Sequence, residues 1–244
     1  MSPFFTELLD NYPGPAFLEK VRGKYHYEKD WSEALKKSAL EMLPFLQKEA
    51  FWESMPAEWS DTVSLRQSAP EEENAAGSRR KAAGTKYERV VISLGAGLDR
   101  LQEQYSEQGS LSKSYMLEAL AGELLMESYA AYNRYVAETT DWHVARYHFP
   151  GSEEAYPLEM LPELLAGLTK RVTCNAAFCL IPKKSVVFVA ELTQDESVQC
   201  EGICMGCHKM HCTNRIEDDF QTRRRIARMT DMPLHYGYSR IFGK

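Results

Sequence analysis

Two apolar runs decide the predicted fold: Val172-Thr-Cys-Asn-Ala-Ala-Phe-Cys-Leu-Ile181 and Ser185-Val-Val-Phe-Val-Ala-Glu-Leu192. Pro182-Lys-Lys184 lies between them and supplies a residue without a ladder donor and two charges that prefer water, as turns do. The apolar positions are nearly continuous, which is typical of strands covered on both faces. The runs are therefore predicted to form a hairpin-like pair of strands, in which Cys174 and Cys179 are small buried apolar residues.

Four more cysteines follow within thirteen residues, at Cys200, Cys204, Cys207 and Cys212. Thiolates so close in sequence can close around one thiophilic ion or cluster, and His208 and His211 could replace some of them. The first three have the spacing of the radical S-adenosylmethionine cluster motif, but the 37 residues after Cys207 cannot build the barrel that such enzymes require. A closed site for zinc or an iron–sulfur cluster is predicted, with free or disulfide-bonded thiols as the alternative.

Composition limits the class of protein. The chain has 244 residues, of which 44% are hydrophobic and 26% charged, which is typical of a soluble globular protein. Its net charge of -6 provides no global basic field for nucleic acid or an anionic membrane. Residues 1–10 lack the features of an export signal, and no apolar run approaches the roughly 20 residues that span a bilayer. We therefore expect a cytoplasmic protein with reduced thiols and neither nucleic acid nor a membrane as partner.

The N-terminal part is predicted to be helical. Apolar residues recur at helical spacing over 31–43 and again over 45–52, within a helical segment that we place at 1–66. Small and charged residues without a large apolar partner occupy 67–84. That composition predicts a flexible surface loop.

A strand, a glycine turn and two helices are predicted next. Residues 89–94, with Val90, Val91 and Ile92 at their centre, are predicted to form a buried strand, and Gly95 and Gly97 end it before a new apolar pattern begins at Leu98. Over 111–136, apolar residues recur at three- and four-residue steps and also occupy much of the remaining circumference. This pattern predicts one long helix that is mostly buried.

Taken in order, these pieces resemble the activation domain of cobalamin-dependent methionine synthase, in particular free-standing bacterial proteins of that type. The likeness covers about residues 89–215. It consists of a strand ending in Ser-Leu-Gly95, the long alanine-rich helix, Arg146 shortly before Pro150-Gly151, a helix with Pro-Leu-x5-Leu-Leu over 157–168, a strand pair whose turn carries Pro182 and Ser185, and a cysteine cluster ending at Arg215.

The resemblance implies an α+β domain, with a mixed or antiparallel sheet packed with long helices and a C-terminal Cys-rich loop. We divide the chain accordingly into a core at 85–198, a Cys-rich candidate metal site at 199–215 and a tail at 216–244, all within one compact unit. The resemblance further implies binding of S-adenosylmethionine and a role in reductive methylation of a corrinoid that has reached its inactive cob(II)alamin state.

Arg146 is the residue that matches the family's cofactor-binding arginine. A guanidinium can hold the methionyl carboxylate through two parallel hydrogen bonds. The other residues expected near the cofactor are Pro150, Gly151, Tyr156, Pro182 and Ser185. The chain departs from the family by one additional residue between Arg146 and Gly151, and Ser152 stands where the family has tyrosine. Tyr156 would have to return to the site across an acidic insert.

Cobalamin itself is expected only through a partner protein. Asp141-x-His143 begins an Asp-x-His-x-x-Gly corrinoid motif, but Arg146 replaces its glycine. The implied partners are a corrinoid-carrying methyltransferase or corrinoid protein and a flavodoxin- or ferredoxin-type reductant. Three hypotheses stay open: an S-adenosylmethionine-binding accessory protein, a metal-bearing electron-transfer or interaction module that has lost the donor site, and a scaffold held together by structural zinc.

Overall fold

The computed structural model describes residues 8–10, 12–57, 84–152, 156–195, 198 and 200, all within one compact unit that spans Met1–Cys207. The elements are α2 (Pro15–Lys24), the 3-10 helix η1 (Lys29–Trp31), α3 (Ser32–Glu49), β1 (Phe51–Ala57), β2 (Thr85–Ser93), α5 (Ala96–Glu107), α6 (Leu111–Thr139), β3 (His143–His148), the 3-10 helix η3 (Leu158–Met160), α7 (Leu161–Leu165), β4 (Thr173–Cys174), β5 (Leu180–Ile181) and β6 (Ser185–Thr193). Almost all of the predicted loop, the cysteines after Cys200 and the predicted tail lie outside the described residues.

A four-stranded antiparallel sheet with the order β1-β2-β6-β3 organises the fold. Strand β6 pairs with β2 on one side and β3 on the other, so it is central. Its side chains alternate between two cores, because successive residues of a strand point to opposite faces. Phe188 and Ala190 enter one core, and Val187 and Val189 enter the other. The second apolar run is therefore a strand buried on both faces, as predicted, and the α+β class is confirmed.

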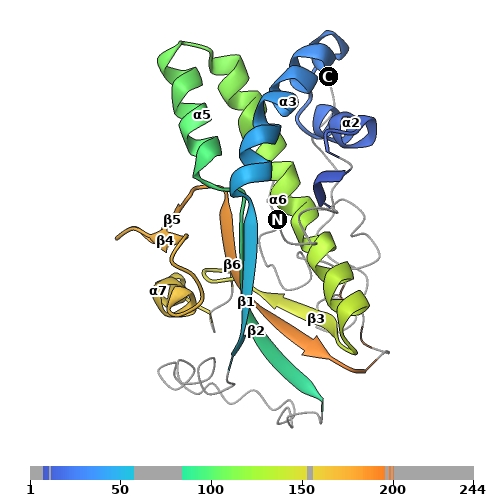
Figure 1. The fold of residues 1–244 in the computed structure, drawn as a ribbon, viewed down its shortest axis with the longest axis vertical. Helices are drawn as coiled ribbons and strands as arrows, with labels where there is room; N and C mark the ends of the chain where they lie inside the picture. Colours follow the sequence, from blue (N-terminus) through green and yellow to red (C-terminus); the bar gives the residue numbers. More distant parts are fainter. Residues whose placement is uncertain are drawn as a thin grey trace, which may run out of the picture. The chain divides into compact units, whose positions relative to one another are not determined.

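Different elements cover the two faces of the sheet (Figure 1). Helix α6 packs over the face that carries Phe188, which we call the helical face, and α2, α3 and α5 pack against α6 or one another and contribute to the same core. Helix α7, η3 and Val172 pack over the face that carries Val187, which we call the α7 face. The sheet thus lies between a large helical layer and a thinner layer built by residues 156–172.

The predicted strand–glycine–helix sequence and the long helix are confirmed. Strand β2 ends at Ser93, and α5 follows after Gly95, whose φ of 91° is in the region that favours glycine. A Cβ at Gly95 would lie 2.4 Å from the Cβ of Glu49, so the end of α3 leaves room only for glycine. Helix α6 has 29 residues and twelve buried positions. In the described ranges no helix is both long enough and apolar enough to cross a membrane.

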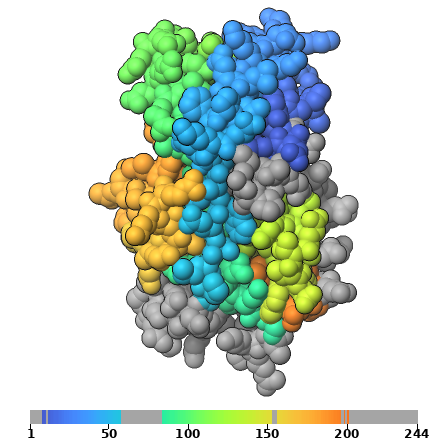
Figure 2. Space-filling view, in the orientation of Figure 1, coloured from blue at the N-terminus to red at the C-terminus, as the bar shows by residue number. Residues whose placement is uncertain are grey.

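The predicted helix over 45–52 is wrong at its end. Helix α3 stops at Glu49, and Phe51–Ala57 forms the edge strand β1 along β2. The aromatic residues of this segment fit a helix or a strand equally well in sequence, and only pairing with β2 decides between them. Pro56 is tolerated because an edge strand has one side without ladder bonds. Strand β1 is visible in cyan at the surface in Figure 2.

The predicted hairpin-like pair of strands is also wrong. The first run forms its own small hairpin, in which β4 and β5 contribute two residues each, and β6 pairs elsewhere. Asn175 divides the run, because its side-chain Oδ1 accepts the backbone N–H groups of Ala177 and Cys179 at 3.0 and 2.9 Å. This turn leaves Cys179 exposed, so it is not the buried apolar residue that was expected.

Two further segments differ from the predictions. The helix expected over 157–168 is reduced to η3 and the five-residue α7, after which the backbone turns at Ala166 and Gly167. Residues 143–148, to which no strand was assigned, form the edge strand β3. Long-range pairing with β6 supplies the hydrogen bonds that β3 lacks locally.

Candidate functional site

Two rows of side chains cross the α7 face near the carboxyl end of β6. The first row is Ala57, Tyr87, Glu191 and Arg146, and the second is Met55, Arg89, Val189 and His148. Directly opposed side chains on neighbouring antiparallel strands have Cβ atoms about 4.5–5.5 Å apart. The register therefore places the guanidinium-bearing Arg146 beside the carboxylate-bearing Glu191.

An irregularity in β3 turns Arg146 toward this face. The register shifts between Val144 and Arg146, which is a β-bulge. Val144 and Tyr147 both pack in the core of the helical face, although they are three positions apart and would point to opposite faces of a regular strand. Because of the bulge, Arg146 and His148 share the opposite face with Glu191.

His148 lies between Glu191 and Tyr156. Its Nε2 atom is 3.1 Å from Oε2 of Glu191, and its ring is stacked on that of Tyr156, with centroids 4.7 Å apart and planes at 20°. His148 is 5% exposed and Tyr156 is 2% exposed, whereas the Glu191 side chain is 24% exposed. We call Arg146, His148, Tyr156 and Glu191 the Arg146 cluster.

The chain after β3 folds back to this cluster. Gly151, with φ 78°, donates its N–H to the carbonyl oxygen of Tyr156 at 2.7 Å. Ser152 donates its hydroxyl to the carbonyl oxygen of Phe149 at 2.7 Å and so closes the turn that contains Pro150. Tyr156 therefore returns across the acidic insert to the end of β3. The structure brings four predicted residues, Arg146, Pro150, Gly151 and Tyr156, into one region.

Pro182 and Ser185 lie elsewhere. Ser185 begins β6, and its hydroxyl donates to Oγ of Ser93 at 2.8 Å. Glu191, the partner of Arg146, is six positions further along β6 than Ser185, which corresponds to about 20 Å of strand. Pro182 is buried in the preceding turn. The structure thus does not place these two predicted residues beside Arg146.

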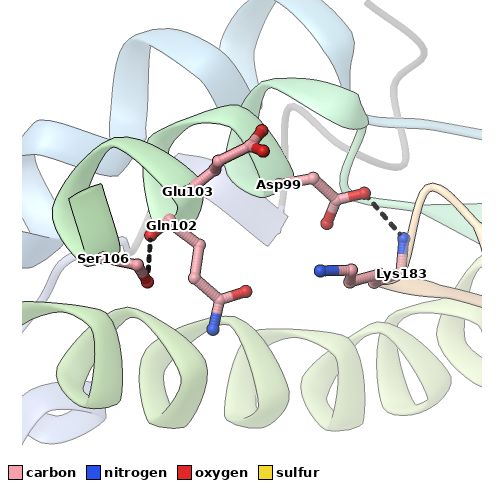
Figure 3. Close-up of a pocket in the computed structure, with 5 residues that line it drawn as sticks. All are labelled: Asp99, Gln102, Glu103, Ser106 and Lys183. Atoms are coloured by element: carbon pink, nitrogen blue, oxygen red, sulfur yellow. Dashed lines mark hydrogen bonds between the residues drawn. The ribbon is translucent and has the colours of Figure 1, made fainter. Parts of the chain in front are cut away.

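The turn that contains Pro182 borders an open hollow of about 490 Å³ (Figure 3). Asp99, Gln102, Glu103 and Ser106 of α5 line it, with Lys183 opposite. Oδ2 of Asp99 accepts the Lys183 backbone N–H at 2.9 Å, and the neighbouring Lys184 forms an ion pair with Glu118 of α6. These contacts hold the turn against both helices, so Asp99 has a positioning role.

Of the predicted metal ligands, only Cys200 is described. It is half-buried and packs against the core of the helical face. Burial, and to a smaller extent the nearby Cys200, raises the pKa of Tyr147. Two residues before Cys200, the carbonyl oxygen of Val198 lies 2.8 Å from Nε2 of His143, which ties this segment to β3. No three His, Cys, Asp or Glu side chains are grouped to hold a metal within the described part of the chain, and Cys204, Cys207 and Cys212 lie outside it.

Sequence reasoning missed Glu191 and His148. The signal for Glu191 was present, because it is the single charged residue of β6. His148 could be placed beside it only once β3 was known to be a strand in this register. The chain matches no family model, and no curated protein matches it. The geometry of the Arg146 cluster therefore carries the functional argument.

Proposed function

We propose that this chain is a cytoplasmic S-adenosylmethionine-binding accessory protein that supports reductive methylation of a corrinoid on a partner, such as a methionine synthase-like methyltransferase. The region around the Arg146 cluster, including the turn with Pro150 and Gly151, carries the proposal. Arg146, Pro150, Gly151 and Tyr156, which the resemblance assigns to the methyl donor, gather at one end of the sheet despite the additional residue and the acidic insert.

The chemistry of the cluster suits a ligand with a carboxylate. Arg146 is half-buried on a sheet face whose other residues are mostly apolar, where a charge-assisted pair is less weakened by water than on an open surface. Bound there, S-adenosylmethionine would supply a methyl group that its sulfonium activates. The corrinoid and the electron would come from partners, the latter from a flavodoxin- or ferredoxin-type protein.

Anaerobic calorimetric titration with S-adenosylmethionine tests this function. We expect the wild type to bind and Arg146→Ala to bind about 10- to 100-fold more weakly, because a hydrogen-bonded charge pair is lost. Arg146→Lys should lie between them, since lysine keeps the charge without the planar fork. Arg100→Ala is the matched control, because Arg100 pairs with Glu49 at the surface and should not affect binding. A wild type that fails to bind at millimolar concentration, or an Arg146→Ala variant of unchanged affinity, would refute the proposal.

A second candidate function is a metal-bearing electron-transfer or interaction module. It is favoured by the placement of Cys200, because the first of the four clustered cysteines is anchored on the core and beside a segment tied to β3. Together with Cys204, Cys207 and Cys212, it would supply four thiolates for an iron–sulfur cluster or zinc.

Metal and sulfide analysis of anaerobically purified protein distinguishes an iron–sulfur cluster from a zinc site. Iron with acid-labile sulfide and a visible absorbance that bleaches on reduction is expected for a cluster, and colourless protein with zinc for a structural site. Cys204→Ser should lower the metal content, whereas Cys179→Ser, which changes an exposed thiol on the β4–β5 turn, should leave it unchanged. Metal-free protein whose stability is insensitive to chelators would exclude both sites.

A further inference from the structure

We propose that Glu191 binds the ammonium group of the same ligand, so that Arg146 and Glu191 together recognise an α-amino-acid headgroup and His148 positions the Glu191 carboxylate. This inference rests on the proposed function and adds two residues to it. It also defines the substrate class of the site as zwitterionic.

The register provides the first argument. Arg146 and Glu191 are directly opposed on β3 and β6, and both point to the α7 face. An α-amino acid carries a carboxylate and an ammonium group on one carbon, so it needs one cation and one anion at short separation. The paired side chains supply these two charges in adjacent positions of one row.

The position of Glu191 in the sheet provides the second argument. Strand β6 lies inside the sheet, and Glu191 is its single charged residue. The other residues of β6 are apolar or are serine or threonine. A carboxylate in such a strand is costly unless charged or hydrogen-bonding groups face it, and His148 and Arg146 both lie beside it here. The Glu191 side chain nevertheless keeps 24% of its surface exposed, so a ligand can reach it from the α7 face.

The surroundings of His148 provide the third argument. Stacking on Tyr156 fixes the plane of the imidazole, and Nε2 then lies 3.1 Å from Oε2 of Glu191. An imidazole protonated on Nε2 donates to that oxygen and holds the carboxylate in one orientation. His148 is only 5% exposed, so it acts on the ligand through Glu191 and is a positioning residue.

Two truncated ligands test the assignment: 5′-methylthioadenosine, which lacks the whole headgroup, and decarboxylated S-adenosylmethionine, which keeps only the ammonium. Glu191→Gln should bind S-adenosylmethionine and its decarboxylated form about 10- to 100-fold more weakly than wild type, and 5′-methylthioadenosine equally well. Arg146→Ala should lose affinity for S-adenosylmethionine but not for the decarboxylated form. Unchanged binding of 5′-methylthioadenosine also reports that each variant keeps a folded site.

His148 is tested by two replacements. His148→Phe keeps a ring to stack on Tyr156 but has no donor, and it should weaken S-adenosylmethionine binding several-fold; His148→Gln restores a donor and should recover part of the loss. Glu41→Gln, which removes a carboxylate paired with Lys113 on the helical side, is the matched control and should bind like wild type.

The outcomes separate this inference from the proposed function. If the wild type binds S-adenosylmethionine but Glu191→Gln retains full affinity, the inference is overturned and the proposed function stands. If Glu191→Gln loses the same affinity for all three ligands, the residue is structural and the inference is again overturned. If the wild type binds no S-adenosylmethionine, the proposed function fails and the inference fails with it.

Discussion

Replacing Phe188 with alanine is expected to lower the free energy of unfolding by about 3 to 5 kcal/mol. Phe188 lies at the centre of β6, is fully buried, and has ring centroids of Tyr129, Tyr132, Tyr147 and Phe149 at 5.2 to 5.7 Å. Removing it would leave a cavity between α6 and the sheet that these rings could fill only in part. Lost burial and lost edge-to-face contacts both contribute to the effect.

Urea denaturation followed by circular dichroism measures this change. We expect a lower midpoint with an unchanged slope, because the surface exposed on unfolding is nearly the same. Tyr115→Ala is the control, since Tyr115 is 55% exposed and its ring contacts only Tyr27 among the described rings. It should cost less than about 1 kcal/mol. Similar losses for the two variants would show that the aromatic core of the helical face is not the main support of the sheet.

The second large effect is expected from a buried ion cluster between α2 and α6. The Glu123 side chain is 1% exposed, and its oxygens lie 2.7 Å from Nζ of Lys20 and 2.6 Å from Nζ of Lys24. Lys20 also forms an ion pair with Glu127. Lys20→Met combined with Lys24→Met would leave the Glu123 carboxylate buried without a cation. We expect a loss of about 3 kcal/mol at pH 7, at the lower end of the range for such pairs because Lys20 is half-exposed.

The pH dependence of this effect has a definite sign. Burial by itself would raise the pKa of Glu123, but hydrogen bonds and charges from Lys20 and Lys24 outweigh it and hold the pKa below its ordinary value. A carboxyl group of this kind contributes stability above its unfolded pKa of about 4.3 and loses that contribution as the pH falls through the folded pKa. In the double variant only burial acts, which raises the pKa of Glu123, so the deficit relative to wild type should be full at pH 7 and shrink toward pH 4.

Urea denaturation at pH 7 and pH 4 tests both statements. Glu123→Gln should cost less than the double lysine variant, since both lysines can turn their ammonium groups to water. Lys113→Met is the matched control, because Lys113 and Glu41 are both about one-third exposed and a surface pair contributes about 0 to 1 kcal/mol. A deficit of equal size at the two pH values would mean that lost packing of the lysine chains, and not the buried charge, explains the effect.

Local patterns in the sequence were sufficient for some elements of the fold. The long helix was predictable because its apolar periodicity extends over many turns, and β6 and the second half of β2 because each contains a run of apolar, mostly β-branched residues. The turn at Gly95 was also predictable, because a glycine directly after a run of strand residues indicates a turn. Sequence patterns could not separate helix from strand in β1 and β3, which are short edge strands whose residues gain their hydrogen bonds from distant partners.

The candidate site was predictable only in part. Arg146, Gly151 and Tyr156 were selected through the resemblance, and the structure places them in one region, whereas Pro182 and Ser185 lie at the other end of β6. Whether S-adenosylmethionine binds there stays a prediction, as do the metal site and the partners. Three of the four proposed metal ligands lie outside the described residues, so their arrangement stays a prediction as well.

By itself the sequence determined that α6 and β6 are largely buried, because apolar periodicity reports burial without any knowledge of partners, but it did not show that the turn at Asn175 leaves most of residues 173–181 exposed. Only the tertiary structure decided which strands pair, since the register of β3 against β6 depends on residues more than forty positions apart in the chain. That register places Glu191 opposite Arg146, and the bulge in β3 turns Arg146 and His148 to the face where Tyr156 returns. The physical reason is that the side chains of a strand alternate between the two faces of the sheet. Shifting the register of β3 by one residue would therefore point Arg146 and His148 into the core of the helical face.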